Sequence, residues 1–340
     1  MSADSSADGS LESYQKTSSI KITKRTNRSI YMCALQHMLK PFSTLLVKPP
    51  QPPYPAGSPQ LKVYWTTRTK CNWQARRVDD IYIYDLTAKH PASRKTKPEE
   101  KRRKKRIYYF AGGGWQSPAS SDHWALCAEL AKKTPDTTVS VVSYPLAPNS
   151  PAPVALPQLL KMQDSLLREA EEADETVIFA GDSAGGNIVL CLTISALLEN
   201  ENARCPTAIL AISPSTDLSR TNPDIKAVAK HDPILQIPFV TATAKAWRGD
   251  LDACDPRISP VYADVSALAR RGVLVHGVTG TYDILAPDAV LMREKLSKAG
   301  VSGEWLDWDK QIHVFPLTWP YFLPEGRAAK EWMVDVLRRC

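Results

Sequence analysis

Apolar runs that resemble strands alternate with amphipathic runs that resemble helices from residue 61 to the end of the chain. The strand-like runs are LKVYW, DDIYIYDL, RIYYFAG, TVSVVSY, ETVIFAG, TAILAIS, GVLVHGV and residues 303–308. The helix-like runs cover residues 121–133, 154–173, 184–198, 288–299 and 325–339. Strands that are almost continuously apolar and separated by helices indicate a parallel sheet covered on both faces. We therefore predict an α/β fold with a mostly parallel central sheet of about eight strands.

The first 60 residues differ in character from the rest. Residues 1–20 are serine-rich and acidic at their start and have no apolar core, so we expect a disordered tail and neither a secretory signal nor a transit peptide. Residues 21–60 combine a helical run, residues 29–47, with the proline-rich connector KPPQPPYPAGSP. We interpret the helical run as a lid or packing helix, with a membrane anchor as the alternative. The main domain is then residues 61–340.

Charge and cysteine usage narrow the class of protein. The formal net charge is +7, and the segment RKTKPEEKRRKKR at residues 94–106 accounts for all of it. We interpret this segment as a solvated loop between strands, with a polyanion-binding patch as the alternative, and we expect no nucleic-acid partner. No apolar run approaches the roughly 18 residues of a membrane span. The seven cysteines are widely spaced without a C-x-x-C pair, which favours reduced thiols, no metal site and a cytoplasmic location.

The segment GDSAG, residues 181–185, lies where a strand-like run gives way to a helical one. A serine between small residues at such a junction can sit on a tight turn that lifts its hydroxyl out of the sheet. The alternative is that Ser183 only caps the helix and that the glycines allow close packing. No G-x-G-x-x-G pattern and no phosphate-loop Gly-Lys-Ser or Gly-Lys-Thr is present, so we expect no nucleotide cofactor. The pattern predicts Ser183 as a nucleophile.

A serine nucleophile needs a base within hydrogen-bond reach and a carboxylate that orients the base. Asp283 follows the strand-like run GVLVHGV, and His313 follows the next strand, so both are expected at the carboxyl ends of strands, as Ser183 is. We therefore predict Asp283 and His313 as the partners of Ser183. Asp288 remains an alternative acid, although it is expected at the start of a helix.

The other histidines fit this role less well. His276 is expected inside a strand and is interpreted as structural. His123 and His231 are interpreted as surface or lid residues, because no strand end precedes them.

Three consecutive glycines, Gly112 to Gly114, end the strand-like run RIYYFAG. Bare backbone amides can approach an oxygen that becomes negatively charged during a reaction, and glycines leave that approach open. The amide of Ala184, directly after the nucleophile, is the expected further donor. The sequence predicts an oxyanion site.

Seven motifs together resemble the hormone-sensitive-lipase-like branch of the α/β-hydrolases, a group that includes plant-type carboxylesterases and many fungal enzymes. They are YYFAGGGW, SYPLAPNSPAP, GDSAGGN, SPSTDLS, DPRISPVYAD, GTYDILAPDA and QIHVF, in the order of the family and spread over residues 61–340. The resemblance implies an α/β-hydrolase fold with a helical cap, here residues 29–47 and an insertion at about residues 218–255. It implies the triad Ser183, Asp283 and His313, with the oxyanion donors Gly113, Gly114 and Ala184. Two departures stand out, because Ala111 replaces the usual histidine before the glycines and Ser215 stands where a tryptophan is common.

The expected activity is hydrolysis of a small, apolar carboxylic ester through an acyl-enzyme, with no cofactor. Trp115 and Trp247 are candidate walls of the substrate pocket, with ordinary core packing as the alternative. A biosynthetic enzyme that uses the same triad for elimination, cyclisation or acyl transfer is an alternative, as is a receptor that binds a small molecule without turnover. A homodimer is also considered.

Overall fold

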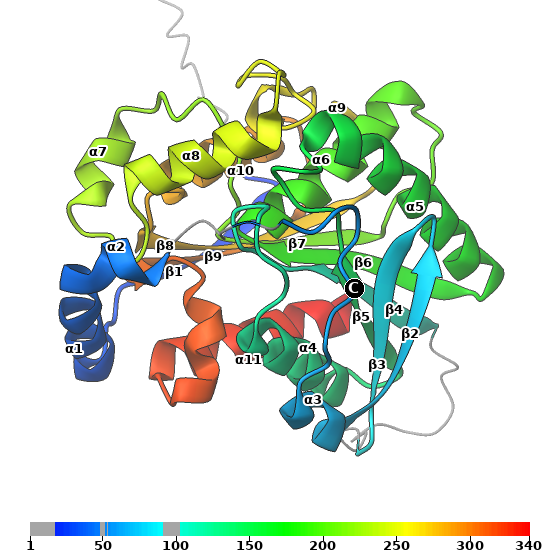
Figure 1. Ribbon diagram of the computed structural model, residues 1–340, viewed down its shortest axis with the longest axis horizontal. Coiled ribbons are helices and arrows are strands. Elements are labelled where there is room, and N and C mark those ends of the chain that lie inside the picture. The colour runs from blue at the N-terminus through cyan, green and yellow to red at the C-terminus, as the bar shows by residue number, and fades with distance from the viewer. Residues whose placement is uncertain (1–17, 48–51, 53, 91–102) are drawn as a thin grey trace, which may run out of the picture.

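A mixed β-sheet forms the centre of the molecule (Figure 1). The computed structural model describes residues 18–47, 52, 54–90 and 103–340, so most of the predicted tail and much of the proline-rich connector lie outside the described residues. Within them the sheet has nine strands in the order β1-β9-β8-β7-β6-β4-β5-β3-β2. The strands are β1 (Ile20–Arg25), β2 (Cys71–Val78), β3 (Ile81–Ala88), β4 (Lys104–Phe110), β5 (Thr137–Ser143), β6 (Glu175–Asp182), β7 (Ala208–Ile212), β8 (Leu274–Tyr282) and β9 (Gly303–Ile312). Only β3 runs antiparallel to its two neighbours, β2 and β5, and every other pair of these strands is parallel. The predicted α/β fold with a mostly parallel sheet is confirmed.

Helices cover both faces of the sheet. The α-helices of the described residues are α1 (Ile30–Leu39), α2 (Ser43–Leu46), α3 (Trp65–Lys70), α4 (Ser121–Lys133), α5 (Ala152–Glu172), α6 (Ala184–Glu199), α7 (Asp224–Ala229), α8 (Ile237–Arg248), α9 (Ser266–Arg270), α10 (Ala286–Lys298) and α11 (Pro324–Arg339), and the 3-10 helices are η1 (Lys40–Phe42), η2 (Pro260–Tyr262) and η3 (Phe315–Tyr321). In Figure 1, α5, α6 and α10 lie on one face and α4 and α11 on the other. Each face has its own apolar cluster, which is why the central strands are apolar on both sides.

The edges of the sheet differ from the sequence prediction. LKVYW was expected to be a strand, but residues 61–64 form no regular element and Trp65 begins α3. The strand at that edge is β2, whose middle residues are mostly exposed, so it lacks the apolar run that marks a buried strand. A two-residue turn at Asp79 and Asp80, both with positive φ (46° and 66°), joins β2 to β3.

The opposite edge is formed by β1, which the sequence analysis assigned to the N-terminal tail and cap element. Ile20 is its one buried residue, and the Ser19 hydroxyl donates to the carbonyl of Val301 (2.7 Å) just before β9. Because β1 pairs with β9, the last strand has no free edge for a second copy of the chain. The homodimer stays a prediction.

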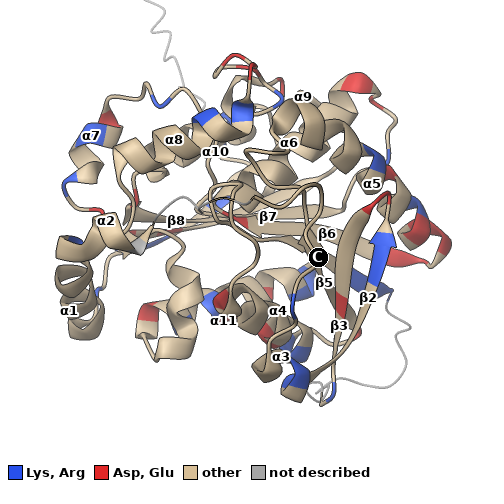
Figure 2. Cartoon of the chain, in the orientation of Figure 1, with Lys and Arg blue, Asp and Glu red and all other residues tan. Residues whose placement is uncertain are grey.

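The basic segment, residues 94–106, ends inside a strand of the sheet. Residues 91–102 lie outside the described part of the chain, but Lys104 and Lys105 begin β4, so the predicted loop is wrong for these two residues. Arg106 follows them in β4, as the strand-like run RIYYFAG predicted. The Arg106 side chain donates to Glu175 at 2.6 Å, and Arg103 pairs with Asp174 at 2.7 Å. Figure 2 shows most charged residues on the outer helices and on the β2–β3 edge, with few on the central strands.

A helical cap lies beside the carboxyl ends of the strands. It consists of α1, η1 and α2 from the N-terminal part together with α7 and α8 from the insertion, as Figure 1 shows. Three hydrogen bonds join its halves: the Lys40 ammonium donates to the carbonyls of Ala229 and Asp232 (2.9 and 2.6 Å), and Gln236 donates to the Ser43 hydroxyl (2.8 Å). Both cap segments were expected to be helical.

Candidate active site

Ser183 stands between β6 and α6 in a strained backbone conformation, with φ 52° and ψ −116°. Its neighbours have to be small: a Cβ at Gly185 would collide with the carbonyl of Phe110, and one at Gly181 would lie 2.5 Å from the carbonyl carbon of Gly185. Close packing of α6 against β4 and β6 therefore requires both glycines. The serine itself remains partly exposed, whereas its immediate neighbours are buried. This is the tight turn predicted from GDSAG.

Asp283 and His313 meet beyond the ends of β8 and β9. His313 Nδ1 and Asp283 Oδ2 are 2.8 Å apart, and the two side chains are 6% and 0% exposed. A hydrogen bond donated by Nδ1 leaves Nε2 as the basic nitrogen of the ring. Burial alone would lower the pKa of His313, but the charge and hydrogen bond of Asp283, together with the charges of Asp232 and Asp182, make the net shift upward.

The loop after β7 connects Ser183 to the histidine. Ser183 donates its amide to the carbonyl of Ile212 (2.8 Å), and the Ser213 hydroxyl accepts the amide of Val314 (3.1 Å), next to His313. Although both residues are described, the structure contains no hydrogen bond between the Ser183 hydroxyl and the His313 ring. In free enzymes such contacts are often long and shorten only when substrate binds.

The glycine loop bends sharply after β4. Gly113 and Gly114 have φ of 129° and 61°, and Trp115 follows with φ 59°. Among the hydrogen bonds of the described residues, none uses the amides of Gly113, Gly114 or Ala184, and Ala184 begins α6, where helical amides have no partner within the helix. The three predicted donors are therefore free to bind an anion.

The glycine loop is held in place although Ala111 stands where the family usually has a histidine. Tyr144 donates its hydroxyl to the carbonyl of Ala111 (2.7 Å), and Gly112 donates its amide to Asp182 Oδ1 (3.0 Å). A Cβ at Gly112 would overlap the Asp182 carboxylate, so this position needs a glycine for a steric reason. These contacts explain how the loop is held where the family usually has a histidine.

The Asp182 carboxylate is the centre of a buried network that the sequence analysis missed. It also accepts the hydroxyl of Tyr109 (2.7 Å) and lies 3.2 Å from His123 Nε2. Burial would raise the pKa of Asp182, but the His123 ring and the hydrogen bonds lower it. The amide of Ser120 donates to His123 Nδ1 (3.0 Å), which places the ring proton on Nε2, facing the carboxylate.

The interpretation of His123 as a surface residue is therefore wrong, since its side chain is 10% exposed and is paired with Asp182. Its position in the first turn of the helix after the glycines was the available signal. His231 is exposed, as expected, and stacks on Tyr282 with ring centroids 4.9 Å apart. His276 lies inside β8 with its pKa lowered to about 4 by burial, in agreement with a structural role.

The structure also places the remaining candidates, Asp288, Trp115 and Trp247. Asp288 is in the first turn of α10 and accepts from Asn222 (2.8 Å), with a pKa raised to about 6 by burial. Trp115 and Trp247 are 1% and 0% exposed and stack on each other with centroids 5.9 Å apart. They lie in the core cluster of one sheet face, so their contact with substrate stays a prediction.

The insertion covers the glycine loop directly. A Cβ at Gly114 would lie 2.8 Å from Thr243 Cγ2 of α8. Below the cap, an aliphatic cluster joins the insertion to the loop after Asp283; its buried members are Ile225, Leu235, Val240, Ile284 and Leu285.

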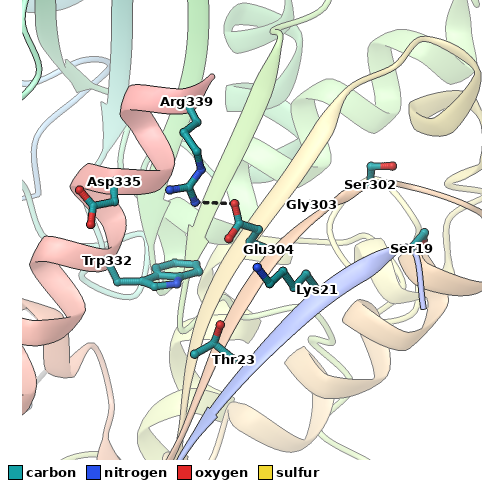
Figure 3. A pocket seen from close by; sticks show the side chains of 9 residues that line it. All are labelled: Ser19, Lys21, Thr23, Ser302, Gly303, Glu304, Trp332, Asp335 and Arg339. Atoms are coloured by element: carbon teal, nitrogen blue, oxygen red, sulfur yellow. Dashed lines mark hydrogen bonds and ion pairs between the residues drawn. The ribbon is translucent and has the colours of Figure 1, made fainter. Parts of the chain in front are cut away.

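The structure has a pocket away from Ser183, Asp283 and His313, at the amino ends of two strands. The pocket has a volume of about 700 Å³ and lies near the amino ends of β1 and β9. Figure 3 shows its lining side chains, among them Lys21, Glu304, Asp335 and Arg339. Arg339 pairs with Glu304 at 2.5 Å, and the two cationic and two acidic groups balance. Ser183, Asp283 and His313 do not line this pocket.

Two further observations concern the described residues only. No group of three or more histidine, cysteine or acidic side chains there is arranged to hold a metal ion. No helix in the same residues has the length and apolar character needed to cross a membrane.

Comparisons with known proteins identify the family of the chain. A family model described as alpha/beta hydrolase fold matches residues 107–317, and the chain therefore belongs to this family. An esterase of Acinetobacter venetianus is 31% identical over 208 residues, 61% of this chain and 66% of that protein. Hormone-sensitive lipase of Mus musculus is 30% identical over 111 residues, 32% of this chain and 14% of that protein. The chain thus spans about two thirds of the esterase and a small part of the lipase.

A crystal structure of a hormone-sensitive lipase from a metagenome library superposes with a TM-score of 0.71 at 22% identity, covering 92% of this chain and 99% of the other. At this identity the match concerns the fold. The α/β-hydrolase fold and the resemblance to the hormone-sensitive-lipase-like branch are confirmed.

Proposed function

We propose that this protein is a carboxylesterase-type serine hydrolase that cleaves a small, apolar carboxylic ester through an acyl-enzyme. The observation that carries the proposal is the buried Asp283–His313 pair, 2.8 Å apart, at the same edge of the sheet as the strained turn of Ser183. A buried, oriented imidazole with one free nitrogen is what a serine requires as its base. The esterase names of relatives at about 30% identity support the same reaction class.

The chemistry follows from these positions. Ser183 Oγ attacks the ester carbonyl while its proton moves to His313 Nε2, and the Asp283 carboxylate stabilises the resulting imidazolium. The amides of Gly113, Gly114 and Ala184 stabilise the negative oxygen of the tetrahedral intermediate. His313 then gives the proton to the leaving alcohol. Water attacks the acyl-enzyme in the same manner, its proton going to His313, and the acid is released as Ser183 recovers its proton.

A small, apolar substrate is proposed because the cap lies directly over the glycine loop. Thr243 of α8 contacts Gly114 closely, and the cluster beneath the cap is aliphatic. Charged or extended substrates would have to displace these side chains. An assay with p-nitrophenyl acetate, butyrate and longer esters would measure this preference as a fall in kcat/KM with chain length.

The test of the nucleophile is Ser183→Ala, compared with Ser266→Ala on α9 as a control. A fluorophosphonate probe reacts with an activated serine, so we expect wild type and the control to be labelled and Ser183→Ala to remain unlabelled. Undiminished labelling of a folded Ser183→Ala variant would refute the assignment. Tight binding of an ester without turnover by wild type would instead favour the receptor function.

A further inference from the structure

Asp232 is a buried carboxylate that the mechanism above does not use. It lies between α7 and α8 of the cap insertion, and only 1% of its surface is exposed. Its Oδ1 accepts the amides of Ile234 and Leu235, both at 2.8 Å. These two bonds stay within the insertion and stabilise the turn that leads into α8.

The other oxygen of Asp232 reaches the triad. Oδ2 accepts the amide of Ile284 at 2.9 Å, and Ile284 directly follows the triad acid. Asp283 Oδ1 in turn accepts the amide of Leu285 (2.9 Å), while Asp283 Oδ2 faces His313. Two consecutive amides of one loop are therefore held by two carboxylates, one from the cap and one from the triad.

A buried carboxylate is costly for a residue whose role is only to hold two segments together. Within the described residues no cation forms an ion pair with Asp232, and the nearby Lys40 ammonium donates to its backbone carbonyl. Burial, together with the charge of Asp283, raises the pKa of Asp232 to about 6. A neutral side chain could cap the same turn without this cost, so the charge itself requires an explanation.

We infer that Asp232 is a positioning residue. Its side chain holds the cap against the loop that follows Asp283 and thereby keeps the Asp283 carboxylate directed at His313. Its charge also acts on His313, whose pKa is raised mainly by Asp283 and to a smaller extent by Asp232 and Asp182. Around Asp232, the ionisable groups that face this corner include Asp283 and His313 from the strand ends and Lys40 from the N-terminal part of the cap. The buried Arg220 guanidinium of the insertion also interacts electrostatically with Asp283. The neighbouring His231 is exposed and turned to Tyr282. The cap thereby influences the triad as well as covering it.

The inference rests on the proposed function, so its test uses the rate of fluorophosphonate labelling, which needs no natural substrate. Asp232→Asn keeps the shape but removes the charge, and it presents an amide where Ile284 needs an acceptor. Asp232→Ala removes all three bonds. Asp224→Asn, an exposed carboxylate on α7 of the same insertion, is the matched control.

We expect Asp224→Asn to match wild type within about two-fold and Asp232→Ala to be labelled roughly 10- to 100-fold more slowly at pH 8, since small misplacements of catalytic groups cost this much. Asp232→Asn should lose less of the labelling rate than Asp232→Ala. The acid limb of its pH–rate profile should lie at lower pH than that of wild type, because removing a negative charge lowers the pKa of His313. Folded Asp232 variants that are labelled at the wild-type rate with the wild-type pH profile would overturn the inference.

Two safeguards separate the possible failures. If wild type itself is not labelled, the proposed function fails before Asp232 is tested. If neither Asp232 variant folds, Lys40→Met replaces them, because it frees the carbonyls of Ala229 and Asp232 at the partly exposed rim of the same corner. Slower labelling of Lys40→Met then supports the inference, and wild-type labelling contradicts it.

Discussion

Replacing Gly112 with alanine is expected to disable the oxyanion loop without disturbing the sheet. The backbone of Gly112 lies outside the left-handed region, so alanine carries no conformational penalty there. Its Cβ would, however, overlap Oδ2 of Asp182 and lie only 3.0 Å from both the Asp182 carbonyl oxygen and Ser183 Cβ. The backbone of the nucleophile turn cannot retreat, because Gly185 already packs against Phe110. The glycine loop has to move instead.

The size of the effect follows from these contacts. Relief of such overlaps requires a displacement on the order of 1 Å, and a misplacement of that size in a catalytic geometry costs roughly 100-fold in rate. Loss of one oxyanion donor costs roughly 2.7–4 kcal/mol of transition-state stabilisation, which is the same range. We therefore expect kcat to fall by about 100-fold or more. KM should change much less, because the oxyanion donors act chiefly in the transition state.

The assay is steady-state hydrolysis of p-nitrophenyl butyrate, with folding checked by circular dichroism. Gly300→Ala is the control: Gly300 has φ 81° at the end of α10, and a Cβ there would meet no atom within 4 Å. It should lose some stability through backbone strain and keep its kcat. The reasoning is refuted if Gly112→Ala retains kcat within about two-fold of wild type, or if both variants lose kcat equally.

Two further predictions concern ionisable groups. Because the pKa of His313 is raised above its ordinary value of 6.5 and only the neutral ring can accept a proton, kcat/KM should fall as pH drops through a value above 6.5; an acid limb centred well below 6.5 would contradict the assigned shift. Lys330→Met should destabilise the fold by roughly 3–5 kcal/mol in urea unfolding, because the buried Glu129 carboxylate, 2.9 Å from the ammonium, would lose its partner. Glu331 is the half-exposed second partner of Lys330, so Glu331→Gln should lower the free energy of unfolding by about 1 kcal/mol or less. Equal losses of stability for the two variants would argue against the importance of the buried Lys330–Glu129 pair.

Local sequence patterns were sufficient to predict secondary structure wherever a segment's structure depends mainly on its own residues. The apolar run ETVIFAG and the small residues around Ser183 predicted β6, the tight turn and α6, because strand burial, turn geometry and helix formation all depend on neighbours in sequence. The helix over residues 121–133 was predicted with both of its ends correct. That Asp283 and His313 lie close together could be expected for a related reason, since residues after parallel strands share one edge of the sheet.

Tertiary contacts decided what those patterns left open. The polar strands β1 and β2 form only because β9 and β3 offer them hydrogen-bonding edges, so hydrophobic periodicity could not reveal them. His123 and Asp232 have ordinary surroundings in sequence, and each becomes important through a contact more than fifty residues away, with Asp182 and Ile284 respectively. The sequence by itself thus determined the α/β fold and was enough to propose the chemical groups of the site, because both inferences use local patterns and the order of the elements along the chain. The supports of those groups were decided only in the folded chain, because a buried carboxylate is defined by the distant amides and rings that surround it.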